Sequence, residues 1–119
     1  MKAILLVSHG SRSAKTKDEV SILINVLRQR FSFAIVEFAF LEIEFPSIPE
    51  GIDICALKGA TQIVITLNFL NAGRHVDEDI PAIVLAAQKK YPLINFVITK
   101  PIGQHPQIPN LFIDLINNA

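Results

Sequence analysis

The sequence holds 119 residues, half of them apolar and 18% charged, with a formal net charge of zero. We expect one compact domain over residues 1–119, since this length and apolar share can build a real core. Balanced charge gives no basic footprint for nucleic acid and no polybasic patch for a membrane surface. Cys55 is the only cysteine, which excludes an intrachain disulfide and a cysteine-based metal cluster. With no apolar run of signal-peptide or membrane-spanning length, we expect a cytoplasmic protein.

Short apolar runs alternate with helical patterns along the whole chain. The runs predict strands over residues 3–7, 34–40, 62–67 and 94–99. Apolar residues recurring at three- and four-residue steps predict helices over about 13–30 and 76–90. Pro49 or Glu50 would open a further helix that runs to about residue 58, with Gly59 as its stop, and a last helix over about 107–117 closes the chain. This alternating order predicts an α/β fold, a four-stranded parallel sheet with helices on both faces.

In such a sheet, ligands bind beyond the carboxyl ends of the strands. His9 directly follows the first expected strand, and Gly10 after it lets the backbone turn sharply. His75 lies in the loop after the third strand. If neighbouring strands supply these two loops, both imidazoles face one crevice, and neutral imidazole is a common ligand of divalent metals. Taken alone, the two histidines fit either a metal site or ordinary loop and capping residues.

Further charged residues follow the same strand ends. Glu42 comes after the second strand, where a carboxylate would complete a metal site, accept protons, or simply stay solvated. Asp79 is placed four residues after His75 to orient that imidazole, although acids in a first helical turn also stabilise the helix. Arg12 and Arg74 would bind acidic substrate groups through bidentate contacts, or remain surface residues.

Several common sites are absent from the sequence. It has no GxGxxG, GxxxxGK[ST] or GxSxG motif, so we expect no nucleotide cofactor and no serine-hydrolase elbow. One Tyr and no Trp leave little for stacking bases, so we expect no nucleic-acid partner. His105 follows the fourth strand without a neighbouring acid or second histidine, and we interpret it as a turn residue, with contact to substrate as the alternative.

Four segments carry a family resemblance, in order and over nearly the whole chain. They are ILLVSHGSR at 4–12, FAFLE at 38–42 with Pro46, FLNAGRHVDEDIP at 69–81, and PIG at 101–103 with Pro106. Together they resemble the motifs of the sirohydrochlorin chelatases of the CbiX type. The first segment alone is weakly specific, whereas the ordered set with GxHxxxDxP is fairly specific.

The resemblance implies a lyase that inserts a divalent metal substrate into a sirohydrochlorin-type tetrapyrrole without ATP. Its members deliver Co²⁺, Fe²⁺ or Ni²⁺ in cobalamin, sirohaem or related biosynthesis. The family's two metal-binding histidines fall on His9 and His75, and an acidic family position falls on Glu42, which makes these three the expected catalytic residues. The chain is similar to the short, single-domain form, which works as a homodimer.

We expect the tetrapyrrole to bind across the loops that carry the two histidines. The expected substrate-binding residues there are Ser8, Gly10, Ser11, Arg12, Phe69, Gly73 and Arg74. Two imidazoles leave coordination positions open for the macrocycle nitrogens, and a neutral histidine or a carboxylate can accept the pyrrole protons. A flat substrate of this size needs a wide cleft, which a small domain offers best at a dimer interface.

Two alternatives stay open at this point. Leu67 replaces a proline found in many members, and Asn68 and Asn71 replace commonly apolar positions, which allows a relative that binds metal or tetrapyrrole without catalysis. The segment Ser8-His9-Gly10 also resembles the Arg-His-Gly motif of histidine phosphatases. Against phosphoryl transfer, Ser8 stands where the phosphate-binding arginine is needed, and 119 residues is short for that fold.

Overall fold

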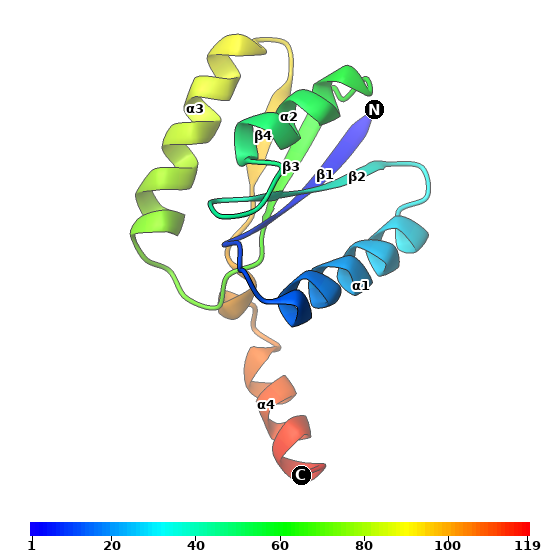
Figure 1. Cartoon of the computed structure of the whole chain (residues 1–119), viewed down its shortest axis with the longest axis vertical. Coiled ribbons are helices and arrows are strands. Elements are labelled where there is room, and N and C mark those ends of the chain that lie inside the picture. Colours follow the sequence, from blue (N-terminus) through cyan, green and yellow to red (C-terminus); the bar gives the residue numbers. More distant parts are fainter.

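The computed structural model describes residues 1–119, in which strands and helices alternate along the chain (Figure 1). The strands are β1 (Lys2–Ser8), β2 (Ile35–Phe40), β3 (Gln62–Leu67) and β4 (Asn95–Ile98). The α-helices are α1 (Ala14–Arg30), α2 (Ile48–Leu57), α3 (Ile80–Lys90) and α4 (Ile108–Asn117). A π-helical turn, η1 (His75–Asp79), leads into α3, and a 3₁₀ turn, η2 (Ile102–Gln104), precedes α4.

The four strands form one parallel sheet in the order β2-β1-β3-β4, as predicted. Val7 of β1 pairs with Ala39 of β2 on one side and with Leu67 of β3 on the other. Because β1 lies between β2 and β3, the loops that follow these three strands meet at the same edge of the sheet. The predicted site residues His9, Glu42 and His75 all belong to these loops.

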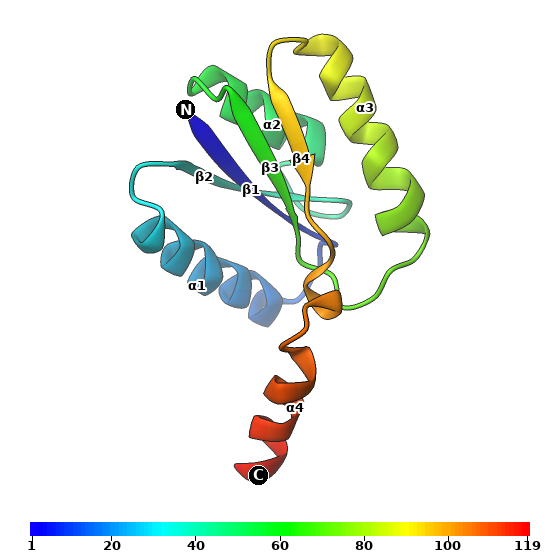
Figure 2. The same cartoon turned by 180° about the vertical axis from the view of Figure 1, so that it is seen from behind.

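Helices cover both faces of the sheet, but unequally. α2 and α3 pack on one face, where residues such as Ile52 and Ile80 join Ile65 of β3 in a core of 15 buried residues. α1 alone covers the other face, where Ile24 meets Leu6 of β1 in a smaller core of six. The two opposite views show α1 on one side of the sheet and both α2 and α3 on the other (Figures 1 and 2).

Local sequence explains the limits of α2. Ser47 and Glu50 form a reciprocal capping box, in which each side chain accepts a hydrogen bond from the other residue's backbone N–H. This cap starts the helix at Ile48, slightly earlier than the proline-based prediction. At the other end, Gly59 has a φ of +97°, a conformation that favours glycine just beyond a helix.

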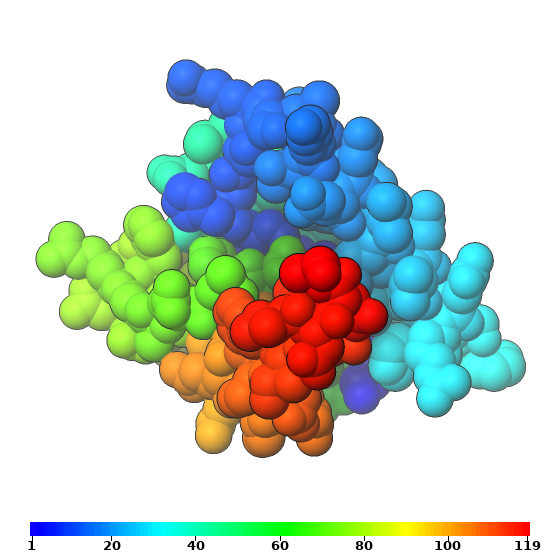
Figure 3. All heavy atoms as spheres, turned by 90° about the horizontal axis from the view of Figure 1, so that it is seen from below, coloured from blue at the N-terminus to red at the C-terminus, as the bar shows by residue number.

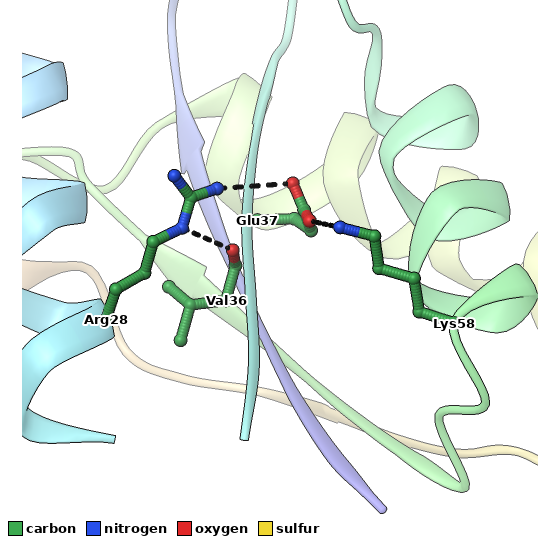
Figure 4. Close-up of polar contacts among 4 residues, drawn as sticks. All are labelled: Arg28, Val36, Glu37 and Lys58. Atoms are coloured by element: carbon green, nitrogen blue, oxygen red, sulfur yellow. Dashed lines mark hydrogen bonds and ion pairs between the residues drawn. The ribbon is translucent and has the colours of Figure 1, made fainter. Parts of the chain in front are cut away.

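Side chains from both helical layers hold the outer edge of β2 (Figure 4). Arg28 of α1 donates from Nε to the free carbonyl of Val36 at 3.1 Å, and its Nη2 lies 3.5 Å from Glu37 Oε2. Lys58, just after α2, pairs with the other carboxylate oxygen of Glu37. Charged side chains over a free strand edge hinder its pairing with another chain, so this cluster protects the edge of β2.

The last helix, α4, lies apart from the rest of the molecule. It extends beyond the carboxyl-end edge of the sheet, and a view from below shows it standing in front of that edge (Figures 1–3). The predicted helix is therefore present, but it covers neither face of the sheet. None of the helices combines the length and the hydropathy that a membrane crossing needs.

Candidate functional site

His9 and His75 lie side by side at the carboxyl-end edge of the sheet. His9 directly follows β1 and His75 opens η1 after β3, and these two strands are neighbours. Their ring centroids are 5.5 Å apart, with ring planes inclined by 43°. Both side chains are about half exposed. The structure therefore brings the two predicted metal ligands together in a place that a large substrate can reach.

Glu42 completes the group from the loop after β2. Its Oε1 lies 2.7 Å from Nε2 of His9, and its backbone N–H donates to the carbonyl of His9 at 3.0 Å. The two loops approach so closely at Gly10 that a Cβ there would lie 1.9 Å from the carbonyl oxygen of Glu42. Gly10 also has a φ of +104°, so glycine is required at this position for two independent reasons.

Asp79 holds His75 from the same turn of helix. Its Oδ2 lies 2.8 Å from Nδ1 of His75, as the spacing of four residues predicted. A proton on Nδ1 makes this a hydrogen bond and leaves the lone pair of Nε2 free for a metal ion. The pair fixes which ring nitrogen of His75 is available.

The predicted helix over 76–90 was wrong at its start. The chain forms a π-helical turn that already includes His75, in which Ile80 donates its N–H to the carbonyl of His75, five residues earlier. Pro81 has no N–H and cannot donate an α-helical bond to the carbonyl of Asp77. A π-turn is wider than an α-turn, and such turns recur at functional sites.

An ion placed at this site would have few protein ligands. No group of three or more His, Cys, Asp or Glu side chains is arranged to hold a metal ion. His9 Nε2 and Glu42 Oε1 are 2.7 Å apart. An ion bound to His9 Nε2 would lie about 2.0–2.1 Å from that nitrogen, so Glu42 would have to move away from Nε2 before an ion could bind there. Such a site keeps open coordination positions, as delivery of the ion to another ligand requires.

Ser8 and Asn68 join the strands beneath His9. Ser8 is 7% exposed, and its hydroxyl accepts a hydrogen bond from the side-chain amide of Asn68 at 3.0 Å. Asn68, one of the departures from the family pattern, thus ties the ends of β1 and β3 together. Leu67, another departure, lies in the main core, whereas Asn71 is exposed.

The predicted substrate-binding arginines differ in their surroundings. Arg12 is exposed and makes no ion pair. Arg74 is also exposed, but its Nε lies 3.6 Å from Glu78 Oε2. The Arg12 guanidinium is therefore free to meet an acidic group, whereas Arg74 would first leave its carboxylate partner.

The other predicted substrate-binding residues lie in the loops after β1 and β3. The backbone N–H of Ser11 donates to Glu44 Oε2 at 2.9 Å, and its hydroxyl accepts from the N–H of Ser13. Phe69 is half-buried against the main core. Gly73 is exposed, with open space where a Cβ would lie. His105 accepts a hydrogen bond from the N–H of Gln107 at Nδ1, as a turn residue does.

Sequence reasoning missed the contribution of α1 to this site. A hollow of about 330 Å³ lies beside His9, and α1 lines it with Thr16, Glu19, Val20 and Leu23. These positions recur at three- and four-residue steps and therefore share one face of the helix. The signal that could have identified them is this spacing on the helix that follows His9, because such a face can line a site as well as pack in the core.

The CbiX family model matches residues 3–119. The chain belongs to the CbiX family. A sirohydrochlorin cobaltochelatase of Priestia megaterium is 39% identical over 108 residues, which cover 90% of this chain and 35% of that protein. A sirohydrochlorin cobaltochelatase of Methanosarcina acetivorans is 29% identical over 123 residues, covering 98% of this chain and 95% of that protein. This chain spans half or less of the first curated relatives it matches.

A solved structure of the CbiX type shares the fold. The crystal structure of the sirohydrochlorin chelatase SirB from Bacillus subtilis subspecies spizizenii, in complex with cobalt, matches with a TM-score of 0.89 at 31% identity. The match covers 98% of this chain and 50% of that chain. The family resemblance and the parallel α/β fold predicted from the sequence are both confirmed. The histidine-phosphatase alternative has no support, because almost the whole chain matches a chelatase family instead.

Proposed function

We propose that this protein inserts a divalent metal ion, Co²⁺ or Fe²⁺, into sirohydrochlorin or a closely related tetrapyrrole. The observation that carries this proposal is the pair of His9 and His75, with ring centroids 5.5 Å apart at the open edge of a CbiX-family domain. Relatives named as sirohydrochlorin cobaltochelatases and the cobalt complex of SirB support the choice of substrates. Ni²⁺ is a further candidate, since imidazole suits it as well.

In this proposal, His9 and His75 hold the incoming ion between them. Asp79 keeps Nε2 of His75 turned toward the ion by binding Nδ1 at 2.8 Å. The protein offers no thiolate at this edge, since Cys55 is buried in the core. Two imidazoles bind a divalent ion while leaving coordination positions for the pyrrole nitrogens. The ion can therefore pass to the macrocycle without first losing all of its ligands.

Glu42 is the proposed proton acceptor. Metal entry requires that pyrrole N–H groups lose their protons, and each proton needs a base within hydrogen-bond reach. In the metal-free structure Glu42 lies 2.7 Å from His9 Nε2. Before that nitrogen binds an ion, the proton shared with Glu42 would leave for solvent or move to Nδ1 of His9. The hydrogen bond to Glu42 then ends, and the carboxylate is left beside the ion with lone pairs free. Entry of a divalent ion releases two pyrrole protons, which Glu42 would accept one after the other. Its side chain is 53% exposed and can pass each proton on to solvent, so the step needs no nucleotide.

We further propose that the substrate is held by Arg12 and that the protein works as a homodimer. Arg12 is the exposed cation beside His9 that has no carboxylate partner, so it suits the peripheral carboxylates of the substrate. The hollow beside His9 measures about 330 Å³ and holds only part of a macrocycle. A second copy would supply the opposite wall of a wider cleft. The SirB chain, half of which this chain matches, supports this size argument. The cytoplasmic location stays a prediction.

The test is anaerobic insertion of Co²⁺ or Fe²⁺ into sirohydrochlorin, followed by absorbance. The wild-type chain should accelerate insertion well above the uncatalysed mixture. His9→Ala and His75→Ala should lose most of that acceleration, whereas His105→Ala, at a turn on the same edge, should keep it. A wild-type chain that binds metal or tetrapyrrole without accelerating insertion would instead be a binding relative. Full rates in both site variants would exclude the paired-histidine mechanism.

A further inference from the structure

α4 exposes an apolar stripe that nothing in the chain covers. Its large apolar side chains are 53–71% exposed, and they are Leu111, Phe112, Ile113, Leu115 and Ile116. Leu111, Phe112 and Leu115 follow three- and four-residue steps and lie on one side of the helix, with Asn110 and Asn117 opposite. A contiguous apolar surface of this kind is typical of a contact site.

The sheet lacks a helix on one half of one face. In parallel sheets, helices normally cover both faces, but here α1 covers only the half formed by β1 and β2. Beside α1 runs a groove of about 480 Å³, whose apolar walls include Leu6, Leu23, Leu27 and Ile102. Val97 of the neighbouring β4 is 39% exposed. The groove thus has the apolar lining of a surface that a helix should cover.

The chain's own α4 is held away from this groove. Just before α4, the N–H of Gly103 donates to the carbonyl of Phe69 at 3.0 Å. A Cβ at Gly103 would lie 1.6 Å from the carbonyl oxygen of Leu70, so the two segments are in close backbone contact. This contact fixes the segment from which α4 departs, and the helix then points out past the edge of the sheet (Figure 2). A helix held in this direction can reach the groove of another molecule.

We propose that two copies of this chain exchange their α4 helices, each helix lying in the groove of the other copy. The charges on α4 and in the groove support the α4 helix of a second copy as the occupant. Asp114 is the only charged residue of α4, and Lys100 is the only Lys, Arg, Asp or Glu among the residues that line the groove. Lys100 is exposed and makes no ion pair within its own chain. A two-fold axis would create the Asp114–Lys100 contact twice, as an isologous dimer requires.

The exchange would also place the second copy over the candidate site. α4 leaves the molecule at the edge that carries His9 and His75, so a copy bound to it stands opposite that edge (Figure 3). The groove shares Leu23 and Asn68 with the hollow beside His9, so the exchanged helix would lie next to that hollow. This inference rests on the proposed homodimer and names the surfaces that form it.

The first test is the dissociation constant of the dimer, measured on the full chain by analytical ultracentrifugation without metal or tetrapyrrole. Lys100→Glu and Asp114→Lys should each raise this dissociation constant about tenfold. Each change puts two like charges at the contact between residues 100 and 114, and a two-fold dimer contains that contact twice. The two changes combined should restore it to within about threefold of wild type. Lys89→Glu, an exposed lysine on the opposite helical layer, should leave it unchanged. A monomeric wild type, or a dimer that neither single change weakens, would overturn the exchange.

The second test separates exchange from a helix that folds back onto its own groove. One chain carries Leu115→Cys in α4, another carries Leu23→Cys in the groove, and the mixture is treated with a short bismaleimide. The native Cys55 has 0% exposure and does not compete. We expect covalent dimers from the mixture, and also from a single chain that carries both changes. Purely intrachain cross-linking in that double variant would overturn the proposal.

Neither test measures metal insertion, so the outcomes stay distinguishable. A chain that inserts metal at full rate as a monomer, or as a dimer through another surface, would overturn the helix exchange and leave the proposed chemistry standing. A chain that exchanges α4 but accelerates no insertion would overturn the proposed function alone.

Discussion

Nδ1 of His75 lies 2.8 Å from the carboxylate of Asp79, four residues later in the same π-helical turn. The contact assigns one ring nitrogen to the protein and leaves the other for a ligand. Because His9 is its neighbour across the edge of the sheet, the orientation of His75 decides whether the two imidazoles can share one ion. Asp79 is therefore a positioning residue of the proposed metal site.

Asp79→Asn should weaken Co²⁺ binding about tenfold, because a neutral amide holds and polarises the imidazole less strongly than a carboxylate does. Titration of the visible Co²⁺ absorption measures the effect. Asp77→Asn is the matched control, since Asp77 lies in the same turn without contacting a histidine. Equal affinities in the two variants would show that the His75–Asp79 contact does not tune the site.

Glu42→Gln should lower the turnover number of metal insertion about a hundredfold, because the amide cannot accept the pyrrole protons. Co²⁺ affinity should change much less, which separates proton acceptance from metal binding. Glu44→Gln is the control, since an amide oxygen at that position can still accept the hydrogen bond from Ser11. Unchanged turnover in Glu42→Gln would return Glu42 to the status of a solvated loop acid.

Gly10→Ala should lower the free energy of unfolding by about 2–4 kcal/mol, through the positive φ and the clash with the carbonyl of Glu42. Gly73→Ala, where a Cβ meets open space, should change it by no more than about 0.5 kcal/mol. Urea unfolding followed by circular dichroism compares the two. A tolerated Gly10→Ala would mean that the loops after β1 and β2 do not need their close approach.

Much of the fold followed from local sequence. The strand at Gln62–Leu67 was placed correctly to the residue, and the other elements differ from their predicted limits by one or two residues, apart from the start of the third helix. Apolar runs and glycines carry this information because burial and turn geometry act over a few neighbouring residues. The placement of His9, Glu42 and His75 at strand ends came from the same signals.

What the sequence could not supply were relationships between distant segments. That β1 lies between β2 and β3 decides whether His9 meets both Glu42 and His75, and this order depends on the packing of the whole sheet. The contact of Asn68 with Ser8 joins residues 60 positions apart. Likewise, the sequence predicted a helix at α4, but its exposed apolar face and the surface that would cover that face were not predicted.

The burial of Cys55 in the main core can be tested by the pH dependence of the free energy of unfolding. Burial, and to a smaller extent the negative charge of Glu37, raises the pKa of the Cys55 thiol to about 11. The folded chain keeps this proton while the unfolded chain loses it, so stability should fall as pH rises through the unfolded pKa toward 11. The slope contributed by one thiol is at most about 1.4 kcal/mol per pH unit. Urea midpoints between pH 8 and 11 should fall less steeply in Cys55→Ala, and identical slopes would place Cys55 outside the core.

The binding of Co²⁺ to the chain tests the central claim, that His9 and His75 hold one ion together. Calorimetric titration should give one Co²⁺ per chain for the wild type. His9→Ala and His75→Ala should each weaken that binding about a hundredfold, while His105→Ala should bind as the wild type does. If either site variant still binds one Co²⁺ per chain with unchanged affinity, the two histidines do not share an ion, and the account is wrong.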